Sequence, residues 1–190
     1  MAPFVWLITG STSGFGAEFV KSLLAKGDKV IATARNTSKI SHLQEAGAAI
    51  LKLDLTADQT DFDKLAEAAT AIYGGVDVLV NNAGYSHFST IEDDRYDFVC
   101  ERILGNSKSH FISSRENWIK QFQTHVFGPL GVTRSFLPQF RARKSGTLVF
   151  LGSTAAWGGI PTLGAYCASK SALRGRYRPT TESTEIKTEF

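Results

Sequence analysis

The sequence predicts an α/β fold in which a parallel sheet is covered by helices on both faces. Short apolar runs alternate with segments of helical period along the first half of the chain, and few residues separate them. The apolar runs are continuous, which is typical of strands that are buried on both faces. Alternation of such strands with helices indicates parallel strands joined by helical crossovers.

The elements follow one another in a regular order. Residues 4–9 are a continuous apolar run and predict the first strand, and Phe15, Phe19 and Leu23 then recur at helical spacing until Gly27. Further strands are expected over residues 29–34, 49–53, 76–80 and 146–151. A short helix is expected around residues 38–45 and an amphipathic helix over 62–72.

The second half is less regular. A long helix is predicted from Trp118 to Phe140, and another from near Gly164 through Lys170 to about Arg174. Two stretches fit no element: an insert of about 94–114 with no clear period, and a polar tail over 176–190 that carries Pro179. We therefore expect one domain over residues 1–175 and an irregular tail after it.

Composition narrows the function. The 190 residues suit one domain, and a charged fraction of 21% with a net charge of +3 is ordinary for a globular protein. The basic residues are scattered, which argues against nucleic acid as a partner. Two cysteines without metal-ligand spacing predict a reducing compartment and no metal. Neither a signal peptide nor a stretch long enough to cross a bilayer is recognisable, so we expect a cytoplasmic protein without a membrane partner.

A glycine-rich turn between the first strand and the first helix predicts a dinucleotide site. Gly10 allows the tight turn, Gly14 lets the backbone approach a pyrophosphate, and Gly16 permits close packing of helix and strand. The helix that follows presents free N–H groups and the positive end of its dipole to the phosphates. The alternative is a merely structural turn.

The end of the second strand indicates which dinucleotide is bound. Residues 33–36 contain no carboxylate that would hold a ribose 2′-hydroxyl, but they contain Arg35. A guanidinium pairs with a 2′-phosphate, and Ser11, Thr12 and Ser13 offer hydroxyl groups close by. The sequence thus favours NADP(H) over NAD(H), unless Arg35 is simply a solvated loop cation.

The chain resembles the short-chain dehydrogenase/reductase family from residue 4 to about 175, the insert excepted. The matching motifs are the T-G-x-x-x-G-x-G turn over 9–16, N-N-A-G over 81–84, and Y-x-x-x-K over 166–170. The resemblance implies a Rossmann-like doubly wound sheet and an oxidoreductase that interconverts an alcohol and a carbonyl on a small molecule. It implies cofactor contacts by Gly10, Ser11, Thr12, Ser13, Gly14, Phe15, Gly16, Arg35, Asp54, Leu55, Asn82, Ala83, Gly84, Tyr166 and Lys170.

The same resemblance implies a catalytic trio of Ser153, Tyr166 and Lys170. Tyr166 and Lys170 lie four residues apart and face the same side of a helix. A tyrosine is mostly protonated at neutral pH, and a neighbouring ammonium favours its phenolate. Tyr166 is then expected to exchange the substrate's hydroxyl proton, Ser153 to hold the substrate oxygen, and Lys170 also to hold the nicotinamide ribose.

Three departures from the family set limits on this expectation. His125 stands where the family usually carries a catalytic asparagine, and we expect a slower proton relay from it. The insert lengthens a connection that is normally short, and the last strands of the family fold are not recognisable after Gly175. Alternatives therefore stay open: a catalytically impaired NADP-binding protein, or an unstable truncated fragment. A homodimer, common in the family, is also left open.

Overall fold

The computed structural model describes residues 2–88, 114–176 and 185–189. These residues form two compact units. The sheet unit comprises the described residues of Met1–Ala83, Gly128–Leu151 and Tyr177–Phe190, and the helix unit comprises those of Gly84–Phe127 and Gly152–Arg176. Residues 94–113 of the expected insert lie outside the described residues, and Ser114 begins a helix. The expectation of a single domain over 1–175 stays a prediction.

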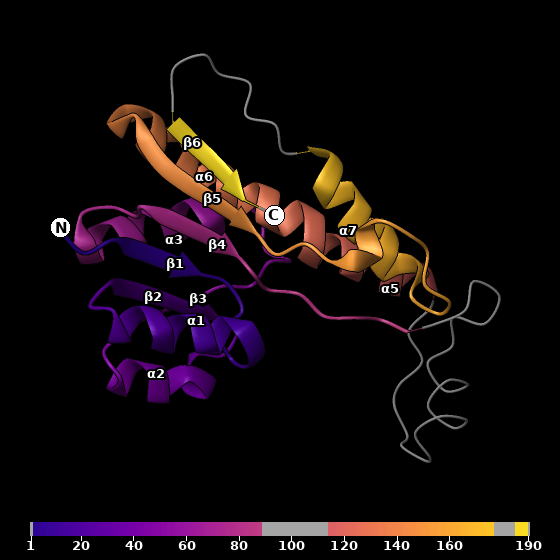
Figure 1. The fold of residues 1–190 in the computed structure, drawn as a ribbon, viewed down its shortest axis with the longest axis horizontal. Helices are drawn as coiled ribbons and strands as arrows, with labels where there is room; N and C mark the ends of the chain where they lie inside the picture. Colours follow the sequence, from indigo (N-terminus) through magenta and orange to yellow (C-terminus); the bar gives the residue numbers. More distant parts are fainter. Residues whose placement is uncertain (1, 89–113, 177–184, 190) are drawn as a thin grey trace. The chain divides into compact units, whose positions relative to one another are not determined.

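The sheet unit confirms the predicted fold class. Among the described residues, strands follow the spatial order β3-β2-β1-β4-β5-β6, and every neighbouring pair is parallel (Figure 1). The first five are β1 (Val5–Ile8), β2 (Lys29–Ala34), β3 (Ala49–Lys52), β4 (Val78–Asn81) and β5 (Ser145–Phe150). Their ends fall within about two residues of the predicted ones, since apolar runs mark strands that are buried on both faces. The order reverses between β1 and β4, where such sheets bind ligands.

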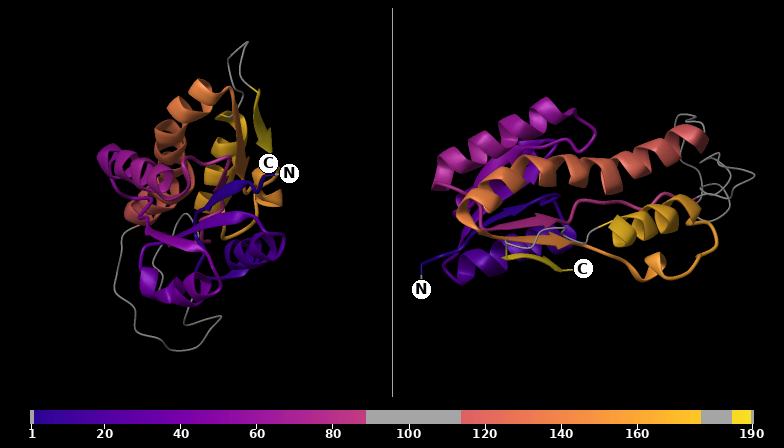
Figure 2. Two further views of the ribbon diagram at one scale, coloured as in Figure 1. Left: turned by 90° about the vertical axis from the view of Figure 1, so that its left-hand side faces the viewer. Right: turned by 90° about the horizontal axis from the view of Figure 1, so that it is seen from above.

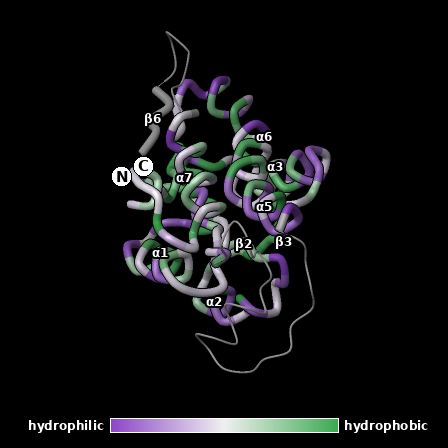
Figure 3. The backbone as a smooth tube through the Cα atoms, turned by 90° about the vertical axis from the view of Figure 1, so that its right-hand side faces the viewer, coloured by the Kyte–Doolittle hydropathy of each residue, from purple (hydrophilic) through white to green (hydrophobic). Residues whose placement is uncertain are grey.

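Helices cover both faces of this sheet. α1 (Gly14–Ala25) lies on one face, and α3 (Gln59–Tyr73) and α6 (Gly128–Arg143) lie on the other (Figure 2). The short elements η1 (Thr37–Ile40) and α2 (Ser41–Glu45) connect β2 to β3. Hydrophobic and hydrophilic residues alternate along α3, as a helix with one buried face requires (Figure 3).

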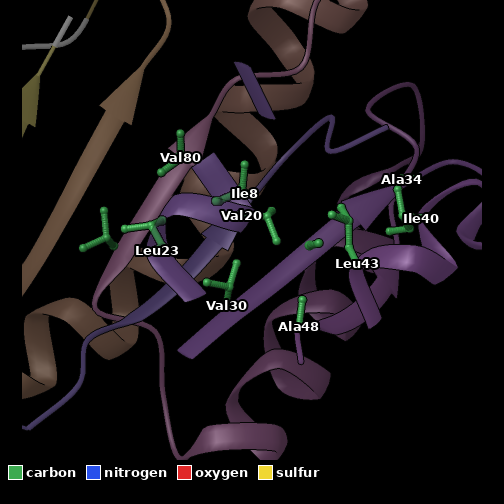
Figure 4. Packing of buried hydrophobic residues seen from close by; sticks show 11 residues of the cluster. Ile8, Val20, Leu23, Val30, Ala34, Ile40, Leu43, Ala48 and Val80 are labelled. Atoms are coloured by element: carbon green, nitrogen blue, oxygen red, sulfur yellow. The ribbon is translucent and has the colours of Figure 1, made fainter. Parts of the chain in front are cut away.

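The core beneath α1 is built from small and branched aliphatic side chains. Val20 and Leu23 of α1 pack on Ile8, Val30 and Val80 of three adjacent strands (Figure 4). The opposite face buries larger rings; Phe62, Phe136 and Phe140 are almost fully buried there. Fully burying one such side chain stabilises the fold by roughly 1.5–3 kcal/mol, so both faces support the loops that leave the strands.

The tail differs from the sequence expectation. Residues 185–189 form β6 (Glu185–Glu189), which pairs in parallel with β5 from Ser145↔Glu185 to Val149↔Glu189. The tail was predicted to be irregular over 176–190 because its residues are polar. An edge strand, however, is held mainly by backbone hydrogen bonds, and the unpaired N–H and C=O groups of β5 offer these to a polar strand.

The helix unit carries the other predicted helices. α5 (Ser114–Phe122) continues through η2 (Gln123–Phe127), a π-helical turn, into α6 of the sheet unit. The long helix predicted over 118–140 is therefore correct, except that a π turn interrupts it at His125. α7 (Gly164–Arg176) agrees with its prediction, and it packs on α5, η2 and the short η3 (Thr154–Ala156). Within the described residues, no helix is long and apolar enough to cross a bilayer.

Candidate functional site

The glycine-rich turn is shaped by close backbone contacts. Gly10 has a φ of +72°, and a Cβ at this position would lie 2.7 Å from the Cα of Ala83. A Cβ at Gly16 would overlap the carbonyl oxygen of Gly10 and lie 2.6 Å from Nδ2 of Asn82. Neither position has room for a side chain, because the turn after β1 is pressed against the residues that follow β4.

Hydrogen bonds fasten these two segments together. Thr9 Oγ1 accepts from the backbone N–H groups of Asn82 and Ala83, each at 3.0 Å. Asn82 Nδ2 donates to the carbonyl oxygens of Thr9 and Gly10, at 2.9 and 3.2 Å. The two predicted motifs of the sheet unit therefore form one rigid corner at the carboxyl ends of β1 and β4.

The start of α1 is suited to an anion. Ser13 is the N-cap residue, yet its side chain makes no capping hydrogen bond, and the first turn contains no acidic residue. A Cβ placed at Gly14 would meet no atom within 4 Å, and Thr12, Ser13 and Phe15 are exposed. Free N–H groups and the positive helix dipole thus face open space. Ser11 is different: its buried hydroxyl donates to the Ile8 carbonyl.

Arg35 and Asp54 follow neighbouring strands. Arg35 is exposed directly after β2. Asp54 is half-buried after β3 and accepts hydrogen bonds from the backbone and the hydroxyl of Thr56, at 2.9 and 2.8 Å. Partial burial opposes the charge, but these bonds and the Arg35 and Lys52 charges lower the pKa of Asp54 below its usual value. Leu55, the next residue, is buried.

The helix unit places Tyr166 and Lys170 together on α7. Lys170 Nζ lies 5.9 Å from the centroid of the Tyr166 ring. Lys170 is only 7% exposed, and burial lowers its pKa from 10.5 to about 8. Ser153 belongs to the same unit and caps η3, with its Oγ accepting from the backbone N–H of Ala155 at 3.2 Å. Since η3 packs on α7, the predicted trio is held by one group of elements.

His125 lies beside this pair. Its ring makes an edge contact with Tyr166, at 5.5 Å between centroids, and another with Tyr85, at 5.7 Å. His125 is 1% exposed; burial first and the Lys170 charge second lower its pKa from 6.5 to about 3. Gly84, at the end of N-N-A-G, comes close as well, because a Cβ there would lie 3.0 Å from His125 Nε2.

Sequence reasoning missed two residues of this cluster, Gln121 and Ser169. Gln121 is fully buried, and it contacts both the His125 ring and the backbone of Tyr85. Ser169 is buried, with its Oγ 3.0 Å from His125 Nδ1. The available signal was the spacing of Gln121 and His125, which stand four apart among apolar residues of one helix. Among the described residues, no group of acidic, cysteine and histidine side chains is arranged to hold a metal.

Comparisons with known proteins show what the whole chain is similar to. A family profile described as short chain dehydrogenase matches residues 5–185. Oxidoreductase claN of Passalora fulva is 35% identical over 177 residues, which are 90% of this chain and 71% of that protein. Several other curated relatives are matched over little more than half of their length, between 54% and 57%.

Solved structures show the same likeness. The crystal structure of a short-chain dehydrogenase from Streptomyces avermitilis is 36% identical with a TM-score of 0.77, covering 92% of this chain and 58% of that one. A metagenomic short-chain oxidoreductase in complex with NADP is 28% identical with a TM-score of 0.71, covering 90% and 72%.

Proposed function

This chain belongs to the short chain dehydrogenase family, and we propose that it is an NADP-dependent oxidoreductase that interconverts an alcohol and a carbonyl. The observation that carries the proposal is the placement of a buried Lys170 beside Tyr166 on α7. Burying a lysine is costly, and a protein tolerates it mostly where the charge has a task. Here the ammonium is next to a phenol that is otherwise a weak base.

The residues of the sheet unit fit a dinucleotide. The start of α1 offers uncapped N–H groups beside the open space at Gly14, which suits a pyrophosphate. Thr12 and Ser13 would add hydroxyl contacts, and Asp54 and Leu55 would border the adenine. When bound, the nicotinamide supplies or accepts the hydride, which is chemistry that no side chain provides.

Acid–base chemistry would come from the helix unit. In carbonyl reduction, Tyr166 would donate its phenolic proton to the substrate oxygen, and in alcohol oxidation it would take that proton back. Lys170, whose pKa of about 8 leaves it mostly charged at neutral pH, would stabilise the phenolate. Ser153 would hydrogen-bond the substrate oxygen and hold it in line for the transfer.

Replacing Tyr166 by phenylalanine tests this chemistry. Turnover of NADPH with a panel of aliphatic, aromatic and steroidal carbonyls is expected to fall by at least about 10²-fold in Tyr166→Phe. Tyr73→Phe on α3 of the sheet unit is the matched control and should leave turnover unchanged. Equal activity of Tyr166→Phe and the unmodified chain would refute the role of this tyrosine.

The preference for NADP(H) rests on Arg35. Its exposed guanidinium follows β2 where an NAD site would carry a carboxylate, and a bidentate pair with a 2′-phosphate is its natural use. The similar metagenomic short-chain oxidoreductase was solved with NADP, which supports the proposal. Fluorescence titration should show tighter binding of NADPH than of NADH, and Arg35→Ala should remove the difference. The control is Lys26→Ala, which removes a positive charge at the C-terminal end of α1, away from the glycine-rich turn.

A second candidate is an NADP-binding protein with impaired catalysis. It is favoured by His125 at the asparagine position of the family. Saturable NADPH binding without turnover of any carbonyl would select the binding protein. The cytoplasmic location and the homodimer stay predictions, the second testable by gel filtration with light scattering.

A further inference from the structure

The contacts of His125 assign a role to each nitrogen of its ring. The backbone N–H of Tyr85 lies 3.0 Å from Nε2, and because an amide N–H can only donate, Nε2 accepts. Nδ1 lies 3.0 Å from Ser169 Oγ. That hydroxyl already donates its hydrogen to the Tyr166 carbonyl at 2.8 Å, so it accepts from Nδ1. The ring is therefore neutral, with its proton on Nδ1.

Gln121 borders the same ring. Its Oε1 accepts from the backbone N–H of His87 at 3.0 Å, and its Nε2 donates to the carbonyl of Tyr85 at 2.7 Å. These backbone partners fix the orientation of the amide, because each can play only one role. The amide nitrogen also lies 2.9 Å from His125 Nε2 and 3.2 Å from Nδ1, so it does not itself distinguish the two ring nitrogens. The assignment rests on the Tyr85 N–H, and a proton added to Nε2 would meet that donor.

The charged and titratable groups around the ring favour the same form. Tyr166 and Lys170 approach from α7, and Tyr85 and His87 belong to the segment that follows β4. The nearby Lys170 ammonium repels an imidazolium, and burial lowers the pKa of His125 further, to about 3.

We propose that His125 is a positioning residue that joins the segment 84–88 to α7 as a neutral imidazole and carries no proton between groups. With Gln121 it occupies three hydrogen-bonding backbone groups of Tyr85 and His87, while Nδ1 holds α7 through Ser169. The relay expected from the sequence needs a nitrogen that is free to accept and release a proton, and both nitrogens here are engaged. The effect on catalysis rests on the proposed function; the state of the ring does not.

Nuclear magnetic resonance of the whole chain, labelled with ¹⁵N-histidine, tests the ring directly. We expect the His125 signals to show a protonated Nδ1 and to stay unchanged between about pH 5 and 8. The His125 signals are assigned by their loss in His125→Asn. A His125 ring that titrates in this range, or that carries its proton on Nε2, would overturn the proposal.

Two substitutions separate the two hydrogen bonds. A glutamine can place its oxygen near the position of Nε2 and keep the bond to Tyr85, whereas an asparagine can place its amide near Nδ1 and keep the bond to Ser169. Amide exchange of Tyr85 should therefore be about tenfold faster in His125→Asn than in His125→Gln, from the loss of one buried hydrogen bond. Equal exchange in both variants would contradict the assignment.

Kinetics supply the remaining readout. Where the chain turns over a carbonyl, both variants should lower kcat by about fivefold to tenfold, leave KM for NADPH unchanged and leave the pH profile in place. A moved pH profile would mean that His125 carries the proton after all, and would overturn the proposal. If no carbonyl is turned over, the proposed function fails, but the ring and exchange measurements still decide the role of His125.

Discussion

Replacing Gly16 by alanine is expected to destabilise the chain, although the same change in an open helix stabilises it. Gly16 lies in the first turn of α1, where alanine would ordinarily gain about 0.5–1 kcal/mol over glycine. Here the added Cβ overlaps the Gly10 carbonyl oxygen and comes within 2.6 Å of Asn82 Nδ2. The first neighbour is backbone, and the second is held by hydrogen bonds to Thr9 and Gly10.

The magnitude follows from what must move. Overpacking by one methyl group costs about 1–3 kcal/mol, and weakening the two Asn82 hydrogen bonds adds about 0.5–1.5 kcal/mol for each. After subtraction of the helical gain, we expect Gly16→Ala to lower the free energy of unfolding by about 1–5 kcal/mol. NADPH binding should weaken as well, because the same corner shapes the turn.

Urea unfolding followed by far-ultraviolet circular dichroism measures this change. Gly175→Ala is the matched control: this glycine is also helical, in α7, and a Cβ there meets nothing within 4 Å. The control should raise stability by up to about 0.5–1 kcal/mol. Equal or greater stability of Gly16→Ala relative to the unmodified chain would refute the close packing of this corner.

Four further substitutions test charged and polar side chains by urea unfolding. Lys170→Met should raise the free energy of unfolding by up to about 3 kcal/mol at pH 7, because burial lowers the Lys170 pKa from 10.5 to about 8; this gain shrinks above pH 8 and vanishes near 10.5. The pKa of His125 is lowered from 6.5 to about 3, so the free energy of unfolding is highest above pH 6.5 and falls as the pH is lowered, by about 2 kcal/mol at pH 5. His125→Asn should flatten this dependence on pH. Asp77→Ala removes the hydrogen bonds that the Asp77 carboxylate accepts from Val5 N and from Arg143, and it should lower the free energy of unfolding by about 2 kcal/mol. Arg143→Ala should lower it by only about 0.5 kcal/mol, because the Arg143 charge is partly exposed. Two results would contradict these assignments: a pH dependence of the unfolding free energy that Lys170→Met and His125→Asn leave unchanged, or an equal loss of stability in Asp77→Ala and Arg143→Ala.

The sheet unit was largely predictable because its signals are local. A strand buried on both faces must be apolar along its whole length, so β2 was predicted to the residue and the other four of the first five strands to within about two. The turn between β1 and α1 could also be predicted from the sequence, since two backbone segments pack this closely only where a glycine leaves out the side chain. Gly10 and Gly16 indeed have no room for a Cβ.

Other features depend on partners that are distant in sequence. β6 is held through the backbone of β5, and its polar residues carry no apolar run to announce it. The π turn at Gln123–Phe127 interrupts a helix whose apolar spacing continues on both sides. Such turns are frequent at functional sites, and this one presents His125 to Tyr166. The resemblance to the family predicted the trio of Ser153, Tyr166 and Lys170, but it did not predict that Gln121 and Ser169 surround His125.

The polar cluster also changes the interpretation of the insert. The insert of about 94–114 is one of the departures from the family that limit the expected activity, because it lengthens the connection between the N-N-A-G segment and the next helix. Yet Tyr85 and His87, before the insert, are hydrogen-bonded directly to Gln121 and His125 after it. The two ends of the connection are therefore tied together by buried side chains that do not belong to it. Within the described residues, Gln121 and His125 therefore hold the backbone of Tyr85 and His87, and His125 also contacts the Tyr166 ring.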